Sequence, residues 1–248
     1  MAIMVVTSVL LFLITLASSF LQTNLGFGFS VLAMVFLPSL FPFSTAVTLN
    51  QIIVTAADGY LAIRYWKHID WKTMFPLLVV SLVTGIIVTL CSMSAPQGIL
   101  KLILGFALVA ISIFSVWFSA RIKVKPSPAF GMAMGCIAGF GNGLFGMGGP
   151  PVAMYFLTGI NDKLAYLATI QCYFFLSNLT TISIRLTNGS VTWAETPYIL
   201  IGWLGLGIGT WLGLKTFSNL PKNLLKKLVY GFVGVSGVVI AIQEILSR

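Results

Sequence analysis

Two glycine-rich segments interrupt apolar stretches of the chain and place polar backbone atoms where a ligand can reach them. The first is Asn24–Ser30 and the second is Asn142–Pro151. Glycine allows the backbone to leave a helix and allows a ligand to approach it closely. Pro150 suits the first turn of a following helix, where free N–H groups and the helix dipole favour an anion. The two segments predict an anion site, with close helix packing through small residues as the alternative.

A glutamine follows each glycine-rich segment and adds a side-chain donor. The NH₂ group of Gln51 or Gln171 can donate to an anionic oxygen without the desolvation penalty of a buried cation. An interhelical hydrogen bond is the alternative role for each amide. The expected ligand-binding residues are Asn24, Gly26, Gly28, Ser30, Gln51, Asn142, Gly146, Gly148, Gly149 and Gln171.

Asp58 is the only acidic residue well inside an apolar run, and Asn178 occupies the matching position in the second half of the chain. A carboxylate in an apolar interior is a candidate for proton coupling. Arg64 follows six residues later near a loop, so a solvated position is the alternative. Asp58 is therefore a candidate coupling residue.

Enzyme chemistry finds no support in the sequence. The single histidine, His68, lies in a charged stretch and cannot complete a Ser/His/Asp or Cys/His set. The three cysteines form no CxxC spacing and behave as small apolar residues. No metal-ligand cluster or nucleotide-binding motif is present. We expect no enzyme activity, no cofactor and no metal.

The elements that position these residues follow from composition. Of 248 residues, 58% are hydrophobic and 8% are charged, whereas a soluble domain carries about 25% charged residues. So few charges cannot cover a water-soluble surface, and the apolar excess must face lipid. A spanning helix needs about 20 apolar residues, which leaves room for roughly eight to ten crossings. An integral membrane protein in contact with the lipid bilayer is predicted.

Ten apolar runs, separated by short connections that contain helix-breaking residues, predict an all-α bundle rather than a β-barrel. The second run of each set of five is too short to span comfortably, which indicates an interrupted or re-entrant helix. The runs cover residues 3–25, 29–41, 44–66, 73–93, 99–120, 128–146, 149–159, 164–186, 196–215 and 224–246.

The two sets of five runs are copies of one another. Residues 120 positions apart coincide in type, and chance rarely reproduces paired Gly-x-Gly elements together with a polar glutamine. The matches include Phe20 with Phe140, Gly26 with Gly146, Gly28 with Gly148, Met34 with Met154, Gln51 with Gln171 and, after a small gap, Arg64 with Arg185. The sequence predicts two transmembrane repeats, residues 1–122 and 123–248.

The basic residues favour one orientation of these repeats. With five crossings per half the halves are inverted, and eleven Lys and Arg residues fall on one side against Lys101, Arg185 and Arg248 on the other. With four crossings per half the halves are parallel and the split is eight against six. The positive-inside rule favours the inverted repeat, with basic loops in the cytoplasm and both termini outside. The net charge of +9 then reflects topology and gives no support to nucleic-acid binding.

The duplicated Gly-x-Gly pattern, the segment Gly141–Pro151 and the Lys-x-x-x-Gly-Phe elements at Lys101 and Lys227 resemble the sulfite exporter TauE/SafE family over nearly the whole chain. The resemblance implies a permease of the bacterial inner membrane for sulfur-containing anions such as sulfite or sulfonates. Members of the family differ in substrate.

The residues and the resemblance together predict a secondary transporter, and an exporter, of a small sulfur-containing oxyanion that works by alternating access. The glycines would supply backbone donors, while Gln51 and Gln171 would orient the anion. No pair of buried Lys or Arg residues is apparent, which fits binding by neutral dipoles. An anion channel that uses the same dipoles, or a non-transporting membrane assembly subunit, is the alternative.

Overall fold

The computed structural model of the protein describes residues 2–25, 27–115, 127–216 and 222–246. Within these ranges the chain forms helices joined by short turns, without a β-strand. The elements are α1 (Ala2–Leu25), α2 (Phe29–Leu40), α3 (Phe43–Arg64), η1 (Trp66–His68), α4 (Trp71–Met93), α5 (Gln97–Ile113), α6 (Pro128–Phe145), α7 (Gly149–Gly159), α8 (Lys163–Thr187), η3 (Trp193–Glu195), α9 (Thr196–Thr216) and α10 (Lys222–Leu246). The predicted all-α architecture is confirmed, and each predicted run overlaps one α-helix.

Six helices in the described part of the chain are long and apolar enough to cross a membrane, namely α1, α3, α4, α8, α9 and α10. In contrast, α2 and α7 contain 12 and 11 residues. At 1.5 Å per residue they extend roughly 18 and 17 Å, whereas the hydrocarbon core is about 30 Å thick. The short second helix predicted for each half is present, and the chain is a multi-pass membrane protein.

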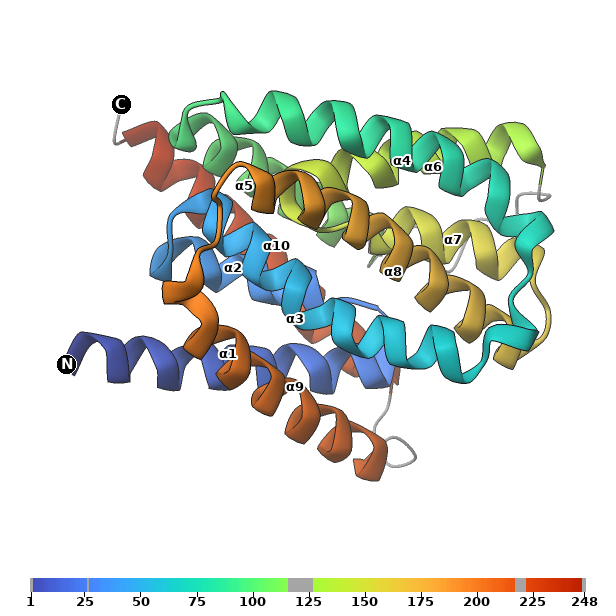
Figure 1. Cartoon of the computed structure of the whole chain (residues 1–248), viewed down its shortest axis with the longest axis horizontal. Coiled ribbons are helices and arrows are strands. Elements are labelled where there is room, and N and C mark those ends of the chain that lie inside the picture. The colour runs from blue at the N-terminus through green and yellow to red at the C-terminus, as the bar shows by residue number, and fades with distance from the viewer. Residues whose placement is uncertain (1, 26, 116–126, 217–221, 247–248) are drawn as a thin grey trace.

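The central pair of helices is α3 and α8 (Figure 1). Their spanning windows are 67% and 56% buried, against 22–33% for the other four spans. Gln51 of α3 contacts Thr181 of α8, and Asp58 contacts Asn178. Between these two contacts the residue number rises along α3 and falls along α8, so the two helices are antiparallel. They are also equivalent elements under the sequence repeat.

A second pair of equivalent helices, α5 and α10, is antiparallel as well. Gly105 lies against Gly237, and the Ser112 hydroxyl donates to the Tyr230 carbonyl at 2.6 Å. The absence of a side chain at both glycines allows the two backbones to approach closely. Both pairs, α3 with α8 and α5 with α10, are therefore antiparallel.

Glycines spaced four residues apart join the two halves at two further contacts. In α9 they lie against successive turns of α1, and in α6 against successive turns of α4, so both of these pairs are parallel. The glycines are Gly205, Gly209 and Gly213 on α9, and Gly135, Gly139 and Gly143 on α6. The first helix of each half thus packs on the fourth helix of the other.

We predict that Gly209→Val destabilises the protein far more than Gly207→Val. A Cβ atom at Gly209 would collide with the Leu16 carbonyl and the Ser19 hydroxyl of α1, whereas a Cβ atom at Gly207 meets nothing within 4 Å. Overpacking of this kind costs about 1–3 kcal/mol, equivalent to a fall in Tm of roughly 2–12 °C. Thermal unfolding in detergent measures both variants. Equal Tm values would contradict this account of the α1 and α9 contact.

The start of α1 and the end of α10 lie at one end of the molecule, at the left of Figure 1, and the α3–α4 and α7–α8 turns lie at the other. Arg64, Lys67, Lys72 and Lys163 occupy or flank those turns, so we call this the basic end. Other residues used to predict the topology lie outside the described residues, as does the repeat boundary at 122/123: Arg121, Lys123, Lys125 and Arg248.

Candidate functional site

A cavity lies between the two glycine-rich segments. Gly28 and Ser30 line it from the first segment, and Gly146, Gly148 and Gly149 line it from the second. The cavity measures about 30 Å³, and a water molecule needs about 10–15 Å³ on this scale. Its size suits a ligand of few heavy atoms. The structure therefore brings the two predicted half-sites together around one small space.

The starts of α2 and α7 face this cavity. Gly28 precedes α2 with φ at 117°, a conformation that favours glycine, and Gly148 precedes α7. No side chain caps either start, so the N–H groups of each first turn lack an intrahelical acceptor. Pro150 and Pro151 carry no N–H, which leaves Gly148 and Gly149 as the donors of α7. Two helix N-termini that face one cavity favour an anion there.

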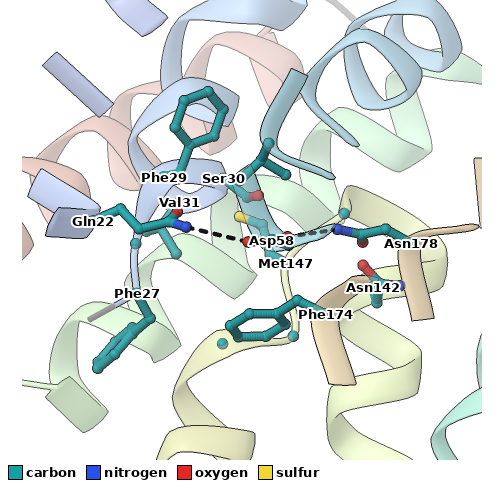
Figure 2. Close-up of a pocket in the computed structure, with 15 residues that line it drawn as sticks. Gln22, Phe27, Phe29, Ser30, Val31, Asp58, Asn142, Met147, Phe174 and Asn178 are labelled. Carbon is teal, nitrogen blue, oxygen red and sulfur yellow. Dashed lines mark hydrogen bonds between the residues drawn. The ribbon is translucent and has the colours of Figure 1, made fainter. Parts of the chain in front are cut away.

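Among the described residues, Asp58 is the only ionisable one that lines this cavity. The side chain is fully buried. The Gln22 amide donates to its Oδ1 at 3.4 Å and the Asn178 amide to its Oδ2 at 3.5 Å (Figure 2). These amides are its hydrogen-bond partners in the described part of the chain, and neither is a cation. Asp58 thus lies in the wall of the cavity and not on the outer surface of the described chain. An ionised carboxylate here would repel an oxyanion, whereas the neutral acid can donate to it.

Gln51 lies behind the cavity rather than in its lining. Its Nε2 donates to the backbone carbonyl and to Oδ1 of Asn142, both at 3.3 Å, and to Oγ1 of Thr181 at 2.8 Å. Gln51 is fully buried, and its Oε1 has no partner. Asn142 lines the cavity and donates to the Ser177 hydroxyl at 2.9 Å. In this conformation the Gln51 amide joins helices, which was the alternative role considered for it.

Gln171 lies elsewhere, in the lining of a second cavity of about 420 Å³. The side chain is 3% exposed, and its Oε1 is buried without a partner. The residue makes no hydrogen bond like those of Gln51 within the described chain. The two glutamines are thus equivalent in sequence and different in environment, and they do not converge on one ligand position.

Arg185 is a buried cation. It is 2% exposed. Its Nη2 donates to the Gly143 carbonyl at 2.6 Å and to Ser92 Oγ at 3.4 Å, and its Nη1 donates to Ser44 Oγ at 3.4 Å. Its Nε has no partner, and it forms no ion pair with a described residue. Helix α8 continues to Thr187, and the hydrogen bond to Gly143 turns this side chain toward α6. Arg185 is not among the residues that line the smaller cavity, so binding of the anion by neutral dipoles stays a prediction.

Comparison with known proteins gives the family. The family model described as sulfite exporter TauE/SafE matches residues 10–240, which is most of the chain. The chain belongs to this family. The resemblance noted from the glycine-rich segments is confirmed.

A relative described as a probable sulfite/organosulfonate exporter TauE, from Cupriavidus necator, is 23% identical over 145 residues. The match covers 56% of this chain and 57% of the relative, so the chain spans little more than half of that protein's length. No solved structure matches the chain. Membership of the TauE/SafE family, with six apolar spans, supports a transport protein of the membrane.

The other residues considered for the site of this TauE/SafE chain differ in whether they line the cavity. Asn24 is buried outside the cavity lining, and its Nδ2 donates to the Phe20 carbonyl at 2.9 Å. Gly26 lies outside the described residues. Gln22 lines the cavity, although the sequence reasoning did not single it out. The signal that could have found it is the repeat, because Gln22 lies 120 positions before Asn142.

Proposed function

We propose that the protein is a secondary transporter that exports a small sulfur-containing oxyanion, such as sulfite or an organosulfonate, by alternating access. The observation that carries the proposal is the convergence of two uncapped helix N-termini, one from each half, on a cavity of about 30 Å³. Backbone N–H groups at helix starts are suited to oxyanions. The family and the description of the Cupriavidus relative support a sulfur anion.

Alternating access rests on an inverted repeat of residues 1–122 and 123–248. The antiparallel pairing of α3 with α8 and of α5 with α10 supports it, since these are equivalent helices. In transporters built this way, one half rocks against the other around a fixed binding site. The substrate would bind where both broken segments meet, against Gly28, Ser30, Asn142, Gly146, Gly148 and Gly149.

Asp58 would couple transport to protons. The described residues of the cavity lining include this carboxyl and no Lys, Arg or His, so an oxyanion binds better when the carboxyl is neutral. The anion and one proton would then cross together. A dianion accompanied by one proton keeps a charge of −1, and a membrane potential that is negative inside drives that charge outward.

The basic end would face the cytoplasm of a bacterial cell, with both termini outside. We predict that a membrane-impermeant thiol reagent labels Lys67→Cys and Lys222→Cys from the cytoplasmic side only, and Asn188→Cys from the outside only. The background lacks Cys91 and Cys136, which are exposed. Labelling of Lys67→Cys and Lys222→Cys from opposite sides would contradict the inverted repeat and favour parallel halves.

Flux measurements test the transport function directly. Proteoliposomes with the purified protein are expected to show saturable uptake of radiolabelled sulfite. A Cβ atom at Gly149 would lie 3.4 Å from Phe27 Cβ and 3.8 Å from Phe174 Cζ, so alanine fits and the methyl groups of valine fill the cavity. Gly149→Ala should keep most of the flux, and Gly149→Val should lower it roughly tenfold or more.

Gly231→Val is the matched control, because a Cβ atom there meets nothing within 4 Å. Its flux should equal that of the unmodified protein. Absence of saturable flux for both sulfite and sulfonates would contradict the proposal, and single-channel currents would identify an anion channel instead.

A further inference from the structure

The larger cavity extends to the basic end and shares one lining residue, Gln22, with the candidate site. It is lined by residues of α1, α3, α8 and α9, and it reaches the exposed side chains of Tyr60 and Arg64. Gln22 lines both this cavity and the smaller one. The Gln22 side chain, which donates to Asp58 at 3.4 Å, therefore belongs to the wall of both cavities.

Under the sequence repeat, residues that line this cavity have equivalents on the opposite side of Asp58. At the offset of 120, Asp58 corresponds to Asn178, and these two residues contact each other between antiparallel helices. An axis of approximate twofold symmetry would thus pass between them. The equivalent pairs on either side of it are Gln22 with Asn142, Gln171 with Gln51, and Leu61 with Thr181.

On one side of Asp58 the equivalent residues are in contact. Gln51 donates to Asn142 and to Thr181, and all three are at most 4% exposed. Further along α8, Arg185 donates to the Gly143 carbonyl on α6. Hydrogen bonds therefore join α3, α6 and α8, and they close the bundle on this side.

On the other side of Asp58 the equivalent contact, between Gln22 and Gln171, is not formed. Gln22 and Gln171 both line the larger cavity, and no hydrogen bond joins them. Gln171 Oε1 is buried without a donor, as Gln51 Oε1 is on the closed side, so the two sides differ in the hydrogen bonds of the amide nitrogen. Gln22 corresponds to the Asn142 partner of Gln51, and its side-chain oxygen can accept from the Gln171 amide.

We propose that Gln51 with Asn142, and Gln171 with Gln22, form two equivalent gates on either side of the anion cavity, the first closed and the second open in this structure. The larger cavity is the gateway of the oxyanion to the basic end, and Arg64 attracts the anion there. When Gln171 closes on Gln22 and Gln51 leaves Asn142, access passes to the other side, and Arg185 becomes the exposed cation. This inference rests on the proposed transport function.

The two gates differ in one acceptor. Thr181 accepts a hydrogen bond from Gln51 at 2.8 Å, whereas its equivalent, Leu61, offers Gln171 no side-chain acceptor. The first gate is therefore the stronger, which accounts for the conformation described.

Crosslinking with dibromobimane tests both gates. The reagent joins two thiols through thioether bonds, which sulfite does not cleave, and it becomes fluorescent when both have reacted. The variants are Gln51→Cys with Asn142→Cys and Gln22→Cys with Gln171→Cys, in full-length protein whose native cysteines, Cys91, Cys136 and Cys172, are replaced by alanine. We expect both pairs to crosslink, the first faster, and each crosslink to lower sulfite flux at least tenfold relative to identically treated single-cysteine variants.

Two outcomes would overturn the proposal: failure of the Gln22 and Gln171 pair to crosslink while the first pair does, or undiminished flux in crosslinked protein. Fluorescence is measured without sulfite, so the closing of each gate is scored whether or not the protein transports. If the cysteine-free protein shows no flux, the proposed function fails, and the fluorescence alone decides whether the two gates exist.

Discussion

Replacing Asp58 with asparagine is expected to abolish the response of sulfite flux to a proton gradient while leaving exchange of sulfite across the membrane intact. The asparagine side chain has the shape of the neutral acid and can still accept from Gln22. The equivalent residue in the second half, Asn178, is already an amide. The variant therefore imitates the protonated carboxyl, which is the form that we propose binds the oxyanion, but it cannot release a proton.

The measurement compares proteoliposomes with and without an imposed pH gradient. In the unmodified protein an outward gradient of protons should accelerate sulfite efflux about tenfold, and in Asp58→Asn the two rates should coincide. Asp162→Asn is the matched control, because Asp162 caps α8 and lines neither cavity, and asparagine caps as well as aspartate. A gradient response that survives in Asp58→Asn would remove this residue from the coupling mechanism.

Features that depend on local sequence could be predicted. The length of each apolar run predicted a helix, because a segment in lipid must satisfy its own backbone hydrogen bonds. Helix breakers placed the ends, as at Gly28 and Gly148, where α2 and α7 begin. The meeting of the two glycine-rich segments was also predictable, because a repeat that breaks at the same position in each half brings both breaks to the interface.

Features that depend on one conformation of the bundle could not be predicted. Gln51 and Gln171 are equivalent in sequence, so no pattern distinguishes the one with three hydrogen bonds from the one that lines an open cavity. Arg64 and Arg185 match in the same way, although one is exposed and the other is 2% exposed. Residues that match in a repeated sequence can lie in different environments in one conformation, and the sequence pattern does not record which residue lies where.

The second large effect is expected for Arg185→Met, which should abolish most of the flux without loss of stability. Each acceptor of the guanidinium keeps another partner: Thr89 donates to the Gly143 carbonyl, Ser92 bonds the Thr89 carbonyl, and Ser44 shares a hydrogen bond with Ser190. No carboxylate is orphaned, because Arg185 forms no ion pair in the described chain. Replacing a buried ion pair with apolar side chains is often neutral or stabilising. A buried cation without an ion pair has the desolvation cost and no ion-pair gain, so Tm should stay equal or rise.

Flux should nevertheless fall roughly thirtyfold or more, because loss of a buried contact between opposite charges costs about 2–5 kcal/mol, here the contact with the anion when this side opens. Arg185→Lys keeps the charge and should restore part of the flux. Arg64→Met should raise the KM only a few-fold, since water screens the exposed guanidinium. If flux and Tm fell together in Arg185→Met, Arg185 would be a structural residue. Arg185 is buried without an ion pair to any described residue, and the proposed transport cycle gives it a negative partner, the anion, when this side opens.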